Sequence, residues 1–183
     1  MSDGLYVPLA EGDLRLEPLA GHHREGLRAA TAADKEIWTI YPHNYAGEAF
    51  DLRFDDLLAA PPQRRVYAML QGERIVGMTA WIERGAQGWA VEIGNSFITP
   101  ELRGTGLNGR VKRLMLGHAF ARGLRRVEFR VDLRNARSQA AVLKLGAQRE
   151  GVLRAERITW NGHVRDAAVF SILAEEWAER TGR

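Results

Sequence analysis

The stretch Pro100-Glu101-Leu102-Arg103-Gly104-Thr105-Gly106-Leu107-Asn108-Gly109 lies between an apolar run over residues 89–98 and a helical pattern over residues 107–121. A glycine-rich turn that leads into a helix start leaves backbone N–H groups without partners inside the helix. Together with the positive end of the helix dipole, these groups form a site for an anion. The stretch therefore predicts a loop that binds a phosphate-rich cofactor. Positive charge around it comes from Arg103, Arg110, Lys112 and Arg113.

The composition is that of an ordinary globular domain. The 183 residues, 45% hydrophobic and 27% charged, predict one domain over residues 1–183. No apolar run approaches the ~20 residues that a transmembrane helix needs, and residues 1–4 lack the basic-then-apolar pattern of a signal peptide. The chain has no cysteine, which excludes disulfides, cysteine-ligated zinc and a thiol nucleophile. We expect a cytoplasmic protein without a membrane partner.

The charges are nearly balanced, with 26 Lys and Arg against 23 Asp and Glu. Lysine occurs only at 35, 112 and 144, and the basic residues concentrate between Arg103 and Arg157. This skew is compatible with nucleic acid, with phosphate ligands or with an arginine-rich proteome. Nucleic acid is not favoured as a partner, because the chain has neither an aromatic-plus-basic strand nor a recognition-helix pattern.

Hydrophobic periodicity predicts a mixed α/β protein. Asn161-Gly162 is a strong hairpin signal, and a helix that connects strands 89–98 and 126–132 predicts that these two are parallel. Residues 34–45 are expected to form a loop with a short helical piece. Strands are expected over 14–19, 65–70, 74–82, 89–98, 126–132, 148–160 and 163–173, and helices over 22–31, 47–60, 107–121, 135–145 and 175–180.

This order of elements, with the glycine turn after the fourth strand, resembles the GNAT superfamily of acetyl-CoA-dependent N-acetyltransferases. The resemblance covers roughly Leu14 to Trp177. Downstream segments resemble the RimJ/RimL branch, which includes ribosomal-protein N-terminal acetyltransferases. These segments are DLRNARS at 132–138, LGAQREGVLR at 145–154, WNGHVRD at 160–166 and FSIL at 170–173.

The resemblance implies an α/β GNAT fold: a mostly antiparallel sheet in which the parallel strands 4 and 5 splay apart, flanked by helices. It implies acetyl transfer from acetyl-CoA to a primary amine of a protein N-terminus or a small molecule, without a metal, and it leaves a homodimer open. The pantetheine arm of the cofactor would pair with the backbone of strand 4. The residues concerned are Phe97, Ile98 and Thr99.

The family's pyrophosphate loop is commonly Arg/Gln-x-x-Gly-x-Gly/Ala. This chain departs from it at the last position, where Asn108 stands and the small residue is displaced to Gly109. Asparagine is tolerated at a helix start, so we expect a cofactor site with shifted contacts. The residues expected to form it are Arg103, Gly104, Thr105, Gly106, Leu107, Asn108 and Gly109.

Two residues near the helix at 135–145 are further cofactor candidates. Asn135 is a favoured N-cap residue, and the equivalent asparagine in family members also holds the pantetheine amides. Ser138 is either an ordinary first-turn serine or, as the resemblance implies, a group near the thioester sulfur that donates a proton to the departing thiolate.

Two carboxylates are candidates for the general base. Glu92 shares a predicted strand face with Gly94 and Ser96, and some GNAT enzymes use a carboxylate on this strand. The alternative is a structural carboxylate paired with an arginine. Glu156 is the second candidate because some RimL-type enzymes use a glutamate close to it, although the register places Arg157 at that point.

Trp38 and Tyr41 lie in the irregular segment that forms part of the acceptor pocket in the resembled family. They are therefore candidates for substrate binding, and packing in the core is the alternative. The five histidines show no metal-ligand spacing, so no metal is expected. A catalytically silent CoA-binding sensor on the same fold is the main alternative to an enzyme, because a fold does not fix a function.

Overall fold

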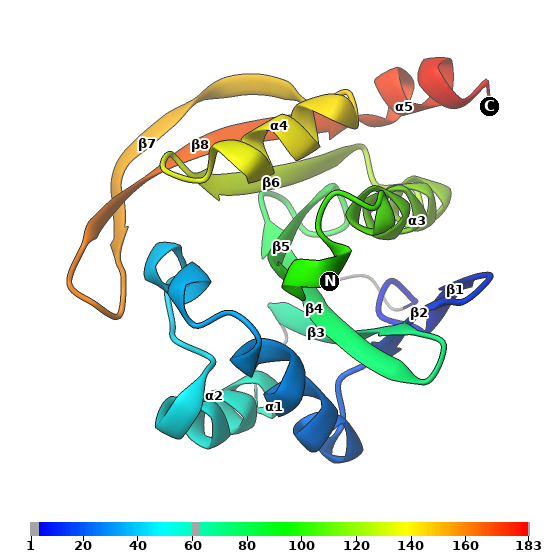
Figure 1. Ribbon diagram of the computed structural model, residues 1–183. Helices are drawn as coiled ribbons and strands as arrows, with labels where there is room; N and C mark the ends of the chain where they lie inside the picture. The colour runs from blue at the N-terminus through cyan, green and yellow to red at the C-terminus, as the bar shows by residue number, and fades with distance from the viewer. Residues whose placement is uncertain (1–3, 60–62, 183) are drawn as a thin grey trace.

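A computed structural model describes residues 4–59 and 63–182. Its strands form one sheet of eight in the order β1-β2-β3-β4-β5-β6-β8-β7 (Figure 1). The strands are β1 (Leu9–Glu11), β2 (Leu14–Pro18), β3 (Arg64–Gln71), β4 (Arg74–Arg84), β5 (Ala90–Ile98), β6 (Arg126–Asp132), β7 (Gln148–Ile158) and β8 (Val164–Leu173). The α-helices are α1 (Arg24–Ala32), α2 (Phe50–Leu58), α3 (Leu107–Ala121), α4 (Ala136–Lys144) and α5 (Ala174–Thr181).

Four short 3-10 helices complete the described elements: η1 (Gly21–His23), η2 (Glu36–Ile40), η3 (Gly47–Ala49) and η4 (Pro100–Leu102). The predicted helix over 47–60 divides into η3 and α2, and its residue 60 lies outside the described residues. The sequence analysis missed β1, which pairs with β2 through a turn at Gly12. Three residues are too few to show the alternation that identifies a strand.

The sheet is antiparallel except at β5 and β6, which confirms the predicted fold class. These two parallel strands pair only over Ala90–Glu92 and Arg126–Glu128. Beyond that point, β5 continues along β4 and β6 continues along β8. The two strands therefore separate within one sheet, and the inner edge of β5 from residue 93 onward has no strand partner among the described residues.

A β-bulge bends β5 at this separation. The register with β4 passes from Ala80↔Gly94 to Met78↔Phe97, and Asn95 takes a positive φ of 49°. The bulge ends the alternation along the strand, so the expectation that Ser96 shares a face with Glu92 is wrong. Ser96 turns toward α3, whereas the Glu92 carboxylate lies over Gly94 on the opposite face.

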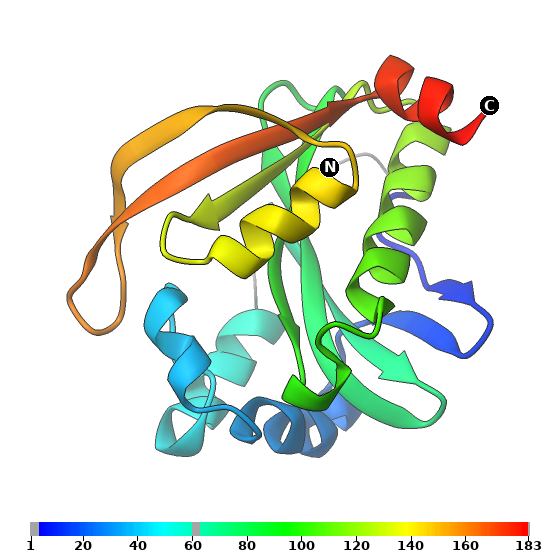
Figure 2. The same ribbon diagram turned by 45° about the horizontal axis from the view of Figure 1, so that its top comes forward.

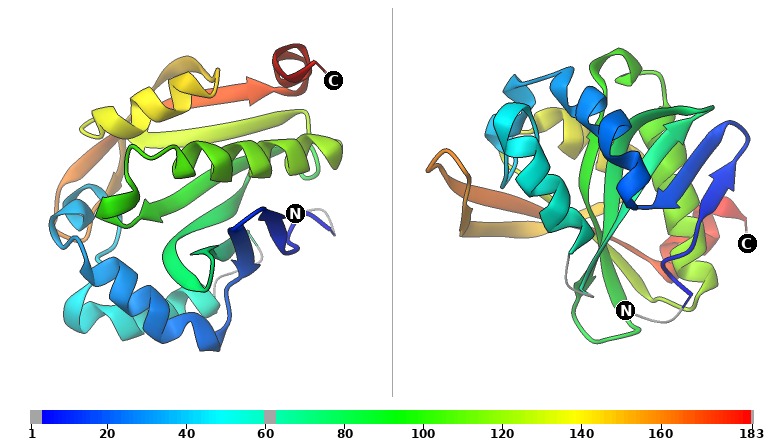
Figure 3. Two further views of the ribbon diagram at one scale, coloured as in Figure 1. Left: turned by 45° about the vertical axis from the view of Figure 1, so that its right-hand side comes forward. Right: turned by 90° about the horizontal axis from the view of Figure 1, so that it is seen from below.

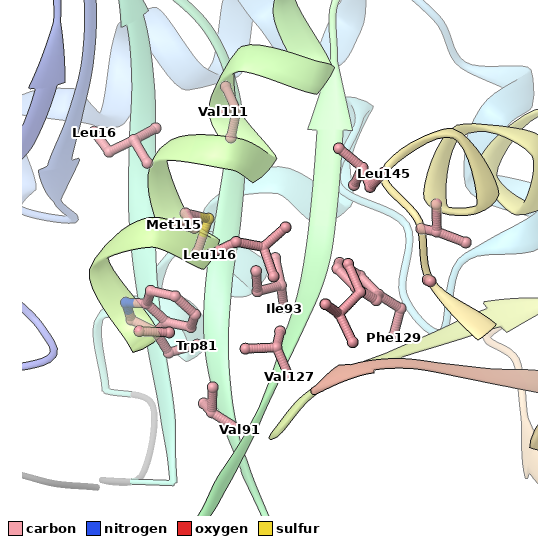
Figure 4. Close-up of a cluster of buried hydrophobic side chains, with 14 of the residues drawn as sticks. Leu16, Trp81, Val91, Ile93, Val111, Met115, Leu116, Val127, Phe129 and Leu145 are labelled. Carbon is pink, nitrogen blue, oxygen red and sulfur yellow. The ribbon is translucent and has the colours of Figure 1, made fainter. Parts of the chain in front are cut away.

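Helices cover both faces of the sheet. Figure 3 shows α3 and α4 on one side and α1 and α2 on the other. The larger buried cluster joins the sheet to α3, α4 and α5 through residues such as Trp81, Met115 and Phe129 (Figure 4). The smaller cluster joins the other face to α1, α2 and η2, with Trp38 fully buried in it. The splayed strands are thus held between two separate packed layers.

The antiparallel hairpin of β7 and β8 forms a long arm that reaches back toward η2 (Figures 1 and 2). At its tip, the Trp160 indole Nε1 donates to the carbonyl of Trp38 at 2.7 Å, and the Trp160 backbone N–H donates to the carbonyl of Pro42 at 3.0 Å. These contacts tie a late segment of the chain to an early one. The arm and η2 therefore stand together beside the splayed strands.

Candidate active site

The separation of β5 and β6 opens into a cavity of about 640 Å³. Its walls come from the loop before α3, from α4, from β5 and β6, from η2 and from the β7–β8 arm. The predicted site residues that line it are Tyr41, Glu92, Phe97, Ile98, Arg103, Gly104, Gly106, Asn108, Gly109, Asn135 and Ser138. Trp38, Thr99, Thr105, Leu107 and Glu156 do not belong to the lining.

The glycine loop presents open backbone at one end of the cavity. Gly104 and Gly106 have φ of 83° and 92°, a region that side chains disfavour, and Gly106 is the N-cap of α3. A Cβ on either glycine would meet no atom of residues 4–59 and 63–182 within 4 Å. The next residues, 107–109, carry N–H groups of the first helical turn, which have no acceptor within the helix. The loop fits the pyrophosphate of a nucleotide cofactor.

Three predicted cofactor residues have structural contacts instead of a place in the cavity wall. The Thr99 backbone N–H donates to Val76 at 2.9 Å, which continues the β4–β5 pairing. The Thr105 hydroxyl donates to the carbonyl of Leu102 at 2.9 Å and lies 3.4 Å from the N–H of Leu107. The Leu107 side chain is buried in the larger cluster. These residues shape the loop.

Arg103 folds back from the loop. Its Nε donates to the carbonyl of Ile98 at 3.1 Å, and its Nη1 pairs with Asp34 Oδ2 at 2.5 Å. Burial acts to raise the pKa of Asp34, but this pair and two backbone N–H groups hold that pKa below its ordinary value. Arg103 thus braces the end of β5 against the segment that leads into η2.

The free edge of β5 runs along the cavity through Phe97 and Ile98. On the neighbouring strand β4, a Cβ added to Gly77 would lie 2.0 Å from the carbonyl oxygen of Phe97. No side chain fits there, so Gly77 lets the two backbones approach closely. An extended chain with amide groups, such as a pantetheine arm, fits this edge because it can pair with the unpartnered backbone.

Asn135 and Ser138 meet at the start of α4. Asn135 is the N-cap, and its Oδ1 accepts the backbone N–H of Ser138 at 3.0 Å. Its carboxamide N–H groups stay available for a ligand, so the capping role and a cofactor role are compatible. Ser138 is half-buried and lines the cavity from the first turn of α4.

Glu92 is buried at the fork of the splayed strands, with 5% of its surface exposed. Arg84 Nε donates to its Oε2 at 2.7 Å, and Arg130 Nε lies 3.9 Å from the same oxygen. Burial nevertheless raises the pKa of Glu92. A carboxyl with a raised pKa in a cavity suits proton transfer, whereas the Arg84 pair suits a structural role.

Glu156 is held by its neighbour. Arg157 donates to both of its carboxylate oxygens. Burial acts to raise the pKa of Glu156, but the Arg157 hydrogen bonds keep that pKa below its ordinary value. Arg157, and not Glu156, lines the cavity, which agrees with the register inferred from the sequence.

The two aromatic candidates differ in their surroundings. Trp38 is fully buried, and its Nε1 donates to the carbonyl of Thr31 at 3.2 Å. Its ring packs 4.7 Å from the ring of Phe97, which places it behind the cavity wall. Tyr41 lines the cavity, and its hydroxyl donates to the carbonyl of Ser96 beside the bulge.

Lys112 was expected only as a positive charge around the glycine loop, but the structure buries it in the cavity wall. This lysine of α3 is 4% exposed and lines the cavity. Its Nζ donates to Thr79 Oγ1 at 3.2 Å and to Ser96 Oγ. Burial lowers the pKa of Lys112 to about 7. The only hint of this burial in the sequence is that lysine is rare in an arginine-rich chain. The hydroxyls that accept hydrogen bonds from Lys112 are aligned by the β5 bulge, which the sequence does not reveal.

A separate cluster joins Glu17, His22 and His23, whose potential ligand atoms lie within 4.8 Å of one another. His23 Nδ1 accepts the backbone N–H of Ala20 at 3.0 Å, so its Nε2 carries the proton and donates to Glu17 at 3.1 Å. Both ring nitrogens of the buried histidine are therefore occupied. The cluster serves as a brace between β2 and the start of α1.

The helices in residues 4–59 and 63–182 are all too short or too polar to cross a membrane.

A family model described as an acetyltransferase (GNAT) domain matches residues 13–148. A probable acetyltransferase of the GNAT family from Chromobacterium violaceum ATCC 12472 is 31% identical, with a TM-score of 0.84 and coverage of 94% of this chain and 93% of that chain. A search of curated proteins gave no significant match.

Two more distant structures show the same fold. Spermidine N-acetyltransferase from Vibrio cholerae, solved with CoA and spermine, is 19% identical with a TM-score of 0.72, covering 91% of this chain and 99% of that chain. RimJ from Mycobacterium smegmatis, solved with CoA-disulfide, is 21% identical with a TM-score of 0.76, covering 96% of this chain and 93% of that chain. The family match spans the glycine loop, the splayed strands and the start of α4, so the chain belongs to the GNAT acetyltransferases and is an acetyl-CoA-dependent acyltransferase.

Proposed function

We propose that this protein transfers an acetyl group from acetyl-CoA to a primary amine by direct attack, and that it belongs to the RimJ/RimL branch. The amine is the N-terminus of a protein or a small molecule. The observation that carries the proposal is the cavity at the point where β5 and β6 separate, with the glycine loop at one end and Glu92 at the fork. Such a cavity brings a thioester and an amine together.

The cofactor side is formed by the loop, the edge of β5 and the start of α4. First-turn N–H groups of α3 bind the pyrophosphate, and Arg113, whose guanidinium lies over Gly109, adds positive charge. The backbone of Phe97 and Ile98 pairs with the pantetheine arm, which Asn135 holds from the other side. Acetyl-CoA supplies an activated acetyl thioester when it is bound.

Positioning supplies much of the rate acceleration. An α-amino group has an ordinary pKa of about 8, so a fair fraction is already neutral at pH 7. A thiol leaves readily because its pKa is only about 8.5. Holding the amine against the thioester therefore supplies much of the acceleration, and a backbone N–H of β5 can polarise the carbonyl.

Glu92 accepts the proton that the amine loses, directly or through water. Its burial raises its pKa toward the pH at which the enzyme works, which is what an effective general base needs. Arg84 and Arg130 hold the carboxylate in place. Ser138, on the other wall of the cavity, donates a proton to the departing thiolate.

A turnover screen tests this function. The purified protein is mixed with acetyl-CoA and a panel of peptides and small amines, thiol release is followed, and the acetylated amine is identified by mass. We expect thiol release that matches the acetylated amine mole for mole. CoA binding without transfer to any amine would support the silent sensor instead.

A further inference from the structure

Two arginines face each other on the β7–β8 arm. Arg157 and Arg165 are direct partners in the antiparallel ladder, and both line the cavity. Like charges at directly opposed positions destabilise a sheet. The fold places this pair beside the site, and an arrangement that costs stability at a binding cavity points to a ligand that offsets it.

A bulge in β7 creates the pairing. The register with β8 shifts between Leu153 and Arg157, and Ala155 takes a positive φ of 48°, which is unusual for a residue with a side chain. The backbone N–H of Ala155 is held by Asp166 Oδ1 at 2.7 Å. The register resumes at Arg157↔Arg165, so both guanidinium groups come from one face of the arm.

Arg165 interacts with the charges of Glu156, Asp132 and Glu92, but its hydrogen bonds are incomplete. Arg165 is 7% exposed, and its Nε is buried without a hydrogen-bond partner among residues 4–59 and 63–182. The Asp132 carboxylate lies 4.0 Å from that Nε, but both of its oxygens already accept hydrogen bonds from Arg134. Arg157 is paired with Glu156. A buried donor of a charged group without an acceptor is costly. That Nε is closed to solvent, so an anion in the cavity would be met by the parts of Arg165 and Arg157 that line the cavity.

The pair lies close to the proposed base. Arg165 donates to the carbonyl of Arg130 at 3.4 Å, and the Arg130 side chain reaches within 3.9 Å of Glu92. A single residue therefore connects the Arg165 guanidinium to the fork of the splayed strands. A molecule that places its amine at Glu92 can extend an acidic group to Arg165.

We propose that the acceptor carries a carboxylate or similar small anion near its amine, and that Arg165, assisted by Arg157, binds this anion. The inference rests on the proposed function and names the acceptor class of that same site. The anion is either the α-carboxylate of a free amino acid or an acidic side chain of a peptide. A polyamine, which has only positive charges, does not fit these arginines.

The first experiment compares matched acceptors with the wild-type enzyme. One arm uses alanine against alaninamide, with each rate corrected for the fraction of amine that is neutral, and the other uses Ala-Asp against Ala-Asn with a blocked C-terminus. We expect the acidic member of one pair to be acetylated with a kcat/KM roughly 10- to 100-fold higher, as a charged hydrogen bond provides. The arm that shows the preference identifies the source of the anion. Equal rates within both pairs would overturn the inference.

The second experiment uses Arg165→Gln and Arg157→Gln. Each substitution should raise KM for the acidic acceptor about 10-fold or more, and should lower the ratio of kcat/KM for the acidic acceptor to kcat/KM for the neutral acceptor by a similar factor. Arg154→Gln is the matched control, because Arg154 is an exposed arginine of the same strand outside the cavity lining. Thermal unfolding checks that each variant folds. An unchanged preference in a folded Arg165→Gln variant would contradict the inference.

Binding measurements distinguish a failure of this inference from a failure of the proposed function. Calorimetry measures alanine and alaninamide, or the peptide pair, against the CoA-loaded protein. Acetylation of neutral and acidic amines alike would leave the function standing and remove the anion site. Tighter binding of the acidic member with no acetylation of any amine would keep the anion site and remove the function.

Discussion

The two ends of the cavity are built differently. The cofactor end comes from one continuous stretch, the loop at 103–109 and α3, with α4 close behind it. The acceptor end comes from η2 and from the β7–β8 arm, which are more than 100 residues apart and meet through Trp160. A ligand common to a whole family can be bound by a local motif, whereas a variable acceptor is met by segments that only the complete fold brings together.

The difference extends to charge. At the cofactor end, open glycines and first-turn N–H groups carry the anion site, and the side chains need little precision. At the proposed acceptor end, the buried ionisable side chains of Glu92 and Arg165 line the cavity, and each depends on its partners. We therefore expect backbone changes to break the cofactor end and side-chain changes to break the acceptor end.

The largest expected effect is at the cofactor loop. Gly106→Val places a β-branched residue at a φ of 92°, which costs on the order of 1–3 kcal/mol and fills the space through which phosphate approaches. We expect acetyl-CoA affinity to fall by about 100-fold, measured by calorimetry. Gly117→Ala in the middle of α3, where a Cβ meets nothing within 4 Å, is the control and should bind normally. Unchanged affinity in Gly106→Val would remove the cofactor from this loop.

Ser138 lines the cavity from the first turn of α4 and is the proposed proton donor to the thiolate. Ser138→Ala should lower kcat by roughly 10- to 100-fold and change KM for acetyl-CoA less, because a proton is needed only as the thiolate develops. Steady-state kinetics with a saturating amine measure both constants. If kcat is preserved and KM alone rises, Ser138 is a binding residue.

The third expected effect is on stability and not on activity, and it concerns Lys112, which joins α3 to the bulged β5. Its pKa of about 7 in the folded protein lies below the ordinary value near 10.4 of the unfolded chain. Between these values the unfolded state binds the extra proton, so stability should rise with pH from about 7 to 10, by up to about 1.4 kcal/mol per unit. Urea unfolding across this range measures it.

Lys112→Met should remove that rise and stabilise the protein at pH 7, because no buried amine then has to lose its proton. Lys35→Met, at an exposed lysine outside the cavity, should keep the wild-type slope. Equal slopes in wild type and Lys112→Met would show that Lys112 keeps an ordinary pKa.

Most of the fold was predictable from local patterns. The alternation of Val127, Phe129 and Val131 and the Asn161-Gly162 turn specify β6 and the arm without tertiary information. The glycine loop was predictable for the same reason, since its chemistry lies in consecutive backbone groups. Sequence periodicity did not predict the bulges in β5 and β7. Asn95 and Ala155 break the alternation there and change the pairing of the residues that follow.

The acceptor end follows from those bulges and could not be predicted. Ser96 faces Lys112, and Arg157 faces Arg165, only because one extra residue in β5 and two extra residues in β7 shift the two registers. The burial of Trp38 behind the wall and the place of Tyr41 in it depend on how η2 packs on β5. Such contacts join distant segments, and no local pattern encodes them.

The most direct test of the account is the pH–rate profile of Glu92→Gln. The glutamine keeps the shape of the side chain and loses the proton acceptor. We predict the largest rate loss at low pH, where little amine is already neutral, and a rate that approaches that of the wild type above the pKa of the amine. A defect of the same size at every pH would contradict base catalysis by Glu92 and leave it a structural role beside Arg84.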